Sequence, residues 1–149
     1  MNSGISYEEY LRTHDALVYS NVGVSMLPLL RQGRDLFVVE RKGPARCRVG
    51  DVILYRRPPS HYVLHRIVAV RDGDYVLLGD NCICREYGIR DADIVGVMTG
   101  YVRNGRRHST EEAGYRLYRF VWLHTIPLRI ALKKALYRIR RGSGTADKG

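Results

Sequence analysis

The sequence predicts a mostly-β domain with a short N-terminal helix and a basic, helical C-terminal tail. Two patterns support this fold class. Segments rich in β-branched and aromatic residues, separated by turn formers, occupy the middle of the chain, whereas apolar residues at helical spacing dominate its end. A length of 149 residues fits one domain, and a hydrophobic fraction of 45% is enough for a buried core.

An N-terminal helical arm is predicted for residues 1–20. Ser6 and Glu9 match a capping box, in which each side chain satisfies a free backbone amide at a helix start. We expect this helix to run from about Tyr7 to Val18. The arm lacks the basic flank and apolar run of a signal peptide, and no apolar stretch of the chain approaches the ~20 residues of a spanning helix. The sequence therefore predicts a cytoplasmic or peripheral membrane protein.

The central domain, residues 21–103, has the composition of β-strands. Five strands are predicted, at Leu36–Arg41, Val52–Arg57, Tyr62–Val70, Asp74–Asp80 and Ile94–Val102. Turn formers separate them, at Gly43–Pro44, Gly50–Asp51, Pro58–Pro59 and Asp72–Gly73. The Asp-Gly pair predicts a tight hairpin between the third and fourth strands.

Residues 104–141 form the predicted basic amphipathic tail, and the small, polar residues 142–149 are expected to be disordered. A second capping box at Ser109–Glu112 precedes one expected helix, and Pro127 stands where another can begin. Apolar residues recur at helical spacing from Leu128 to Ile139. The net charge of the chain is +10, of which residues 103–149 contribute +9. The basicity therefore belongs to the tail.

Three cysteines, an odd number without a secretory signal, argue against a disulfide framework and favour free thiols. Cys82 and Cys84 lack the second pair of ligands that a structural zinc site needs. The sequence thus predicts no metal and no other cofactor. His14, His108 and His124 are expected to be surface or packing residues.

The densest run of chemically informative residues surrounds Ser25, which glycine and proline bracket at Gly23 and Pro28. A tight turn rich in backbone amides can stabilise an oxyanion, but a serine hydroxyl becomes a nucleophile only when a base removes its proton. Taken alone, Ser25 is better explained as a turn-capping residue.

Three further motifs follow in order: Gly50-Asp51 at a strand start, His65 within Leu64–Val68, and Gly79-Asp80-Asn81. This succession resembles the signal peptidases and the related LexA-like self-cleaving repressors, over roughly residues 22–102. The ordered set is far more specific than any one motif. The resemblance implies a signal peptidase/LexA-like coiled β-sheet domain.

The resemblance also implies site residues. Ser25 is the nucleophile, the backbone of Gly23 and Ser25 lies at the oxyanion position, and Asp80 orients the base. His65 takes the base position, where bacterial signal peptidases and LexA-like proteins carry lysine and the endoplasmic-reticulum and archaeal type carries histidine. An ordinary pKa near ~6.5 lets histidine accept the serine proton at neutral pH. His61 should share the face of His65, and Arg66 should face the opposite way into solvent.

Two features depart from the family. Many signal peptidases carry a serine two places before the nucleophile, where this chain has Gly23, and the membrane-spanning segment typical of that family is absent. We nevertheless expect a serine-type endopeptidase that acts on a peptide or precursor protein. The basic tail predicts packing on the β core or contact with an anionic membrane surface, and nucleic acid is the least favoured partner because no binding motif accompanies the charge.

Two alternatives stay open at this point. The first is a non-catalytic peptide- or membrane-binding module on the same fold. The second is a self-cleaving regulator of the LexA-like type, although no Ala-Gly cleavage dipeptide precedes Ser25.

Overall fold

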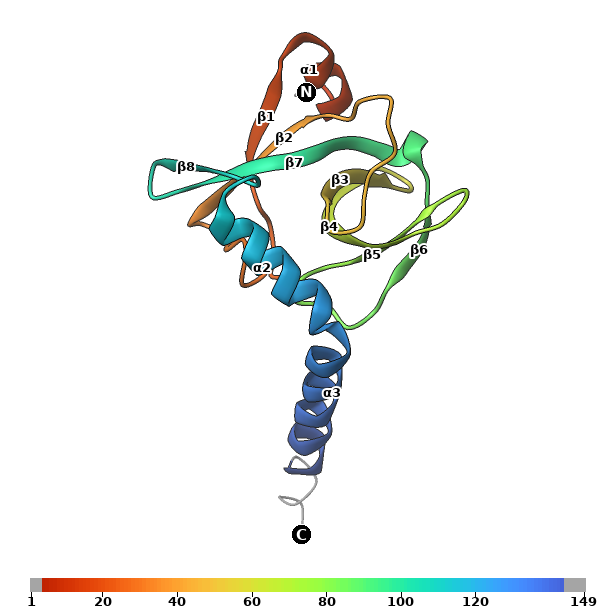
Figure 1. The fold of residues 1–149 in the computed structure, drawn as a ribbon, viewed down its shortest axis with the longest axis vertical. Helices are drawn as coiled ribbons and strands as arrows, with labels where there is room; N and C mark the ends of the chain where they lie inside the picture. Colours follow the sequence, from red (N-terminus) through yellow and green to blue (C-terminus); the bar gives the residue numbers. More distant parts are fainter. Residues whose placement is uncertain (1–3, 144–149) are drawn as a thin grey trace.

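The computed structural model describes residues 4–143, and Figure 1 shows one antiparallel sheet with helices at both ends of the chain. The elements in chain order are α1 (Tyr7–Thr13), β1 (Ala16–Ser20), β2 (Asp35–Arg41), β3 (Val52–Arg57), β4 (His61–Val70), β5 (Tyr75–Leu78), β6 (Glu86–Ile89), the 3₁₀ turn η1 (Asp91–Asp93), β7 (Ile94–Arg103), β8 (Arg106–Ser109), α2 (Ala113–His124) and α3 (Ile126–Ser143). The strand order is β1-β2-β7-β3-β4-β5-β6, and β8 pairs with β7.

The antiparallel sheet, the short N-terminal helix and the helical C-terminus agree with the prediction, and two full C-terminal helices make the architecture mixed α/β. All five predicted strands are present within one to two residues. The hairpin at Asp72–Gly73 joins β4 to β5, and the Arg71 amide donates to the Asp74 carbonyl across it.

Three strands, β1, β6 and β8, were not predicted, and the N-terminal helix was predicted too long. Ser6 caps α1 as expected, accepting a hydrogen bond from the Glu9 amide. However, the helix ends at Thr13, and residues 16–20 pair along their whole length with β2. Pairing with β2 overrides the local helical preference of residues 16–20. A capping box marks where a helix begins and carries no information about where it ends.

Apolar side chains gather in two cores, one on each face of the curled sheet. The first core contains Met26, Leu54 and Leu64 and receives α1 and the side of α2 that carries Tyr115. The second contains Ile53, Tyr55 and Ile67 and lies among β3, β4, β5 and the segment that leads into β7. Because both faces are covered, alternate residues of β3 and β4 enter different cores.

The Ser25 segment is a loop between β1 and β2, fixed at its end by the buried carboxylate of Asp35. That carboxylate accepts hydrogen bonds from the Arg31 amide and from the guanidinium groups of Arg34 and Arg103. Arg103 also donates to the Leu29 carbonyl. The loop is therefore tied to β7 as well as to β2.

Both expected C-terminal helices are present, although α2 begins only at Ala113, with Glu112 as its N-cap residue. Figure 1 shows α3 extending away from the sheet, at the opposite end of the molecule from α1. Residues 142 and 143, expected to be disordered, end α3, and the remainder of that expected segment lies outside the described residues. Within residues 4–143, none of the helices combines the length and hydropathy needed to cross a bilayer.

Candidate active site

Ser25 lies in a loop that is fastened to the turn after β5. The Ser25 carbonyl accepts a 2.8 Å hydrogen bond from the Asn81 amide, and the Asn81 side chain donates to the Val24 carbonyl at 3.0 Å. Met26, the next residue, is fully buried in the first core. The Ser25 backbone is thereby held between the core and the turn that carries the Gly-Asp-Asn motif.

His65 reaches the same point from β4, and Gly79 makes the approach possible. A Cβ atom added to Gly79 would lie 2.8 Å from the Ser25 carbonyl oxygen and 3.0 Å from Nε2 of His65. The backbone of Ser25 and the imidazole of His65 are thus immediate neighbours across this glycine. The structure brings together three of the motifs that the sequence analysis singled out.

The other ring nitrogen of His65 faces β3. Its Nδ1 lies 3.3 Å from the Tyr55 hydroxyl, which donates a 2.5 Å hydrogen bond to the Glu86 carboxylate. Arg57 pairs with the same carboxylate through Nε at 2.9 Å. Sequence reasoning missed Tyr55 and Glu86. Alternation along a hairpin could have placed Tyr55 on the His65 face, but β6, which carries Glu86, gave no signal.

Burial lowers the pKa of His65 below its ordinary value of 6.5. The charge of Glu86 acts in the opposite direction, that of Arg57 lowers the pKa further, and that of Asp80 raises it again. The net direction is downward because a half-buried imidazolium loses solvation. His65 is therefore neutral at pH 7 and able to accept a proton.

Asp80 has other partners than the expected one. Its carboxylate accepts two 2.8 Å hydrogen bonds from Arg66 and one of 2.8 Å from the Tyr118 hydroxyl. The prediction that Arg66 is solvated was wrong, because Arg66 is 1% exposed. It does face away from His65, but α2 covers that face of β4 and Tyr115 contacts the guanidinium.

Of the two backbone amides expected at the oxyanion position, one already donates a hydrogen bond within the protein. The Gly23 amide donates a 2.8 Å hydrogen bond to the Gln32 side chain, in a left-handed conformation (φ +85°) that favours glycine. In the described part of the chain, the Ser25 amide donates to no protein acceptor. An oxyanion could thus be met by the Ser25 amide, whereas the Gly23 amide would first have to leave Gln32.

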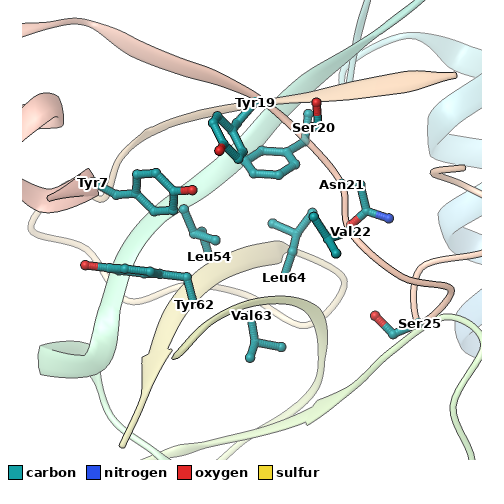
Figure 2. A pocket seen from close by; sticks show the side chains of 11 residues that line it. Tyr7, Tyr19, Ser20, Asn21, Val22, Ser25, Leu54, Tyr62, Val63 and Leu64 are labelled. Atoms are coloured by element: carbon teal, nitrogen blue, oxygen red, sulfur yellow. The ribbon is translucent and has the colours of Figure 1, made fainter. Parts of the chain in front are cut away.

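A cavity of about 220 Å³ opens beside Ser25. Figure 2 shows Tyr7 and Tyr62 at one end and the Ser25 hydroxyl directed inward from the other, with Leu54 and Leu64 between them. This lining is mainly apolar and aromatic, and it draws on α1, β1, β3 and β4. An extended chain with apolar side chains fits such a surface.

The remaining histidines lie elsewhere, as expected. His14 stacks on Tyr10, His108 stacks on Tyr101, and His124 packs on Phe120. His61 is exposed at the start of β4. All three cysteines are free thiols, and Sγ of Cys82 lies close to Gly79 and the Ser25 carbonyl.

Comparison with family models, with curated proteins and with solved structures returned no match for this chain.

Substitution of Gly79 by alanine should disturb the site. The added methyl group would overlap Sγ of Cys82 and the Ser25 carbonyl, so we expect a destabilisation of about 1–3 kcal/mol from overpacking. Gly73→Ala is the control, because its Cβ would meet nothing within 4 Å. Chemical denaturation measures both; equal stability of the two variants would contradict the packing described here.

Asp80→Asn should destabilise the fold strongly, because it leaves the Arg66 guanidinium buried without a counter-charge. Removing one partner of a buried pair costs about 3–5 kcal/mol. Asp74→Asn, which breaks the exposed pair with Arg71, is the matched control and should have a much smaller effect. Urea unfolding compares the two, and a small loss at residue 80 would argue against a structural role.

Proposed function

We propose that this protein is a serine endopeptidase of the signal peptidase type, with Ser25 as nucleophile and His65 as general base. The observation that carries the proposal is the convergence of the Ser25 backbone and the neutral imidazole of His65 on Gly79, with Ser25 at the end of a cavity lined mainly by apolar and aromatic residues. The curled antiparallel sheet is compatible with the signal peptidase/LexA-like fold that the ordered motifs imply.

The proposed reaction proceeds through an acyl-enzyme. Nε2 of His65 takes the proton of the Ser25 hydroxyl as Oγ attacks the peptide carbonyl, and the Ser25 amide donates to the developing oxyanion. The imidazolium then protonates the amine that leaves with the C-terminal fragment. Water, deprotonated by His65, finally cleaves the ester and regenerates the serine.

The substrate we propose is an extended peptide or precursor protein. The cavity lies between α1 and the Ser25 loop, with the rings of Tyr7 and Tyr62 4.5 Å apart at its far end. Aromatic walls favour apolar side chains over charged ones. A segment lying in the cavity would therefore present an apolar residue there and its scissile carbonyl to Ser25.

We further propose that α3 holds the protein on an anionic membrane surface. Leu128, Leu132 and Leu136 are each more than half exposed and follow one another at helical spacing. Lys134, Arg138 and Arg141 lie on the other side of the helix, and residues 113–143 contain no acidic residue. A helix with an exposed apolar stripe and a basic opposite face is typical of helices that lie in the headgroup region.

Binding of α3 to lipid would also place the site close to the bilayer. Arg129 donates to the Asp80 carbonyl at 3.1 Å, and Lys133 donates to the backbone and side-chain oxygens of Asn81. The first turns of α3 are therefore joined to the turn that holds Ser25. A precursor bound to the same membrane would therefore lie close to Ser25.

Ser25→Ala and His65→Ala should each lower the rate of peptide cleavage by on the order of 10³-fold or more. Cleavage of a library of unstructured peptides, followed by mass spectrometry, is the measurement. Ser60→Ala, in the exposed turn before β4, and His61→Ala, at the exposed start of β4, are the controls and should retain activity.

Peptide cleavage by the Ser25→Ala protein at the wild-type rate would contradict the mechanism. If the wild-type protein neither cleaves peptides nor reacts at Ser25 with a fluorophosphonate probe, the non-catalytic binding module is favoured instead. A loss of intact mass on incubation without substrate would indicate self-cleavage.

Neutralising Lys134 and Arg138 should weaken binding to vesicles of phosphatidylcholine that contain phosphatidylserine. Each basic residue near such a surface contributes about 1 kcal/mol, so the double Gln variant should bind roughly 30-fold more weakly. Arg106 and Arg107, exposed on the β7–β8 hairpin, give the control with the same charge change. Equal binding by both double variants, in cosedimentation, would show that α3 is not the contact.

A further inference from the structure

The side chain that supports His65 has to come from the His65 face of the sheet. Asp80 hydrogen-bonds Arg66 and Tyr118, on the α2 side of β4. Because successive residues of a strand point to opposite faces, Arg66 and His65 stand on different sides. The hydrogen-bond partner of His65 is Tyr55, from the neighbouring strand β3.

Proton counting fixes the direction of each hydrogen bond in this cluster. A phenol has one proton, and Tyr55 donates it in the 2.5 Å hydrogen bond to the Glu86 carboxylate, which has no proton to donate. The Tyr55 oxygen therefore acts as acceptor for His65, and the imidazole proton belongs on Nδ1. This leaves the lone pair on Nε2, the nitrogen that lies next to Gly79 and the Ser25 backbone.

Burial and charge hold this arrangement in place. Tyr55 is fully buried, and burial together with the bond to Glu86 raises its pKa, so the phenol keeps its proton. Burial alone would raise the pKa of Glu86, but the hydrogen bonds from Arg57 and Tyr55 bring it below its ordinary value. Glu86 is therefore an anion, fixed by Arg57 through two nitrogens at 2.9 and 2.5 Å.

We propose that Tyr55 and Glu86 are the positioning residues of the site: they hold His65 with its proton on Nδ1 and stabilise the imidazolium that forms when Nε2 takes the Ser25 proton. This role, in which the Glu86 charge acts through the Tyr55 hydroxyl, is the one that the sequence had suggested for Asp80. Its catalytic consequence rests on the proposed peptidase function, whereas its effect on the His65 ring does not.

Several charged or titratable groups act on His65. Tyr55 and Arg57 come from β3, Glu86 comes from β6, and Asp80 lies in the turn after β5. The Cys82 thiol faces the same glycine, Gly79, as Nε2 of His65. Glu86 is the strongest influence that favours the charged ring, and Arg57 opposes it. Removing the Glu86 charge should therefore lower the pKa of His65 further, since only the weaker influence of Asp80 would then oppose the arginine.

The test uses Tyr55→Phe and Glu86→Gln, which keep the shape of each side chain, with Asp74→Asn as a control that also removes a carboxylate paired with arginine. Nitrogen-15 NMR of the histidine rings reports which nitrogen of His65 carries the proton. We expect Nδ1 to carry it in the wild-type protein, and the population to shift toward Nε2 in Tyr55→Phe. An Nε2-protonated wild-type ring, or an unchanged tautomer in Tyr55→Phe, overturns the proposal.

Peptide cleavage gives the second measurement. Each variant should lower kcat by on the order of 10- to 100-fold with KM little changed, because the support is needed mainly when the imidazolium forms. In Glu86→Gln the acidic limb of the kcat/KM profile should move to lower pH, following the lowered pKa of His65. Asp74→Asn should match the wild-type protein. A loss confined to KM, or an unmoved acidic limb, overturns the proposal.

The two measurements separate the two claims. If the ring behaves as expected but the wild-type protein cleaves no peptide, the proposed function fails and the positioning of His65 stands. If peptides are cleaved through Ser25 and His65 but neither variant changes the ring or the rate, the function stands and this proposal fails. Thermal unfolding of each variant verifies that the fold is retained.

Discussion

The bidentate ion pair between Arg66 and Asp80 lies where β4, the turn after β5 and α2 meet, and the arrangement of the site depends on it. Both side chains are almost completely buried, and Tyr115 and Tyr118 close the pair from α2. Such a pair adds little net stability over apolar packing, but losing one partner is costly. Here the pair holds Asp80, and with it the turn after β5, in place. Asn81, the residue after Asp80, hydrogen-bonds the Ser25 loop.

Strand β4 links this pair to the chemistry on the other face of the sheet. Arg66 points to α2, while His65, one residue earlier, points to Tyr55 and Glu86. A small displacement of the turn would therefore separate Ser25 from His65 without touching either side chain. Gly79 occupies the narrowest point between them, and that narrowness explains why the site needs a residue without a side chain there.

Charge is divided between the two ends of the molecule in a way that suits the proposed function. Around His65, Glu86 raises the pKa of the imidazole and Arg57 lowers it, but burial is the largest influence and keeps the imidazole neutral and ready to accept a proton. All charged side chains of residues 113–143 are basic, and α3 is joined to the body at Asp80 and Asn81. The basic tail and the neutral imidazole are thus joined through one turn.

The sequence by itself determined the five central strands, the hairpin at Asp72–Gly73, the start of α1 and the two C-terminal helices, because composition, caps and turn residues act over a few neighbours. It also marked Ser25, His65 and Asp80 as candidate site residues. Only the tertiary structure decided the rest. The strands β1, β6 and β8 form through pairing with other strands, so their own residues carry little signal. Arg66 is buried because α2, far along the chain, covers it, and Asp80 is taken up by that pair. Alternation along the β3–β4 hairpin places Tyr55 on the His65 face, but Glu86 reaches this pair from β6, 31 positions from Tyr55 in sequence. No local pattern encodes that second proximity.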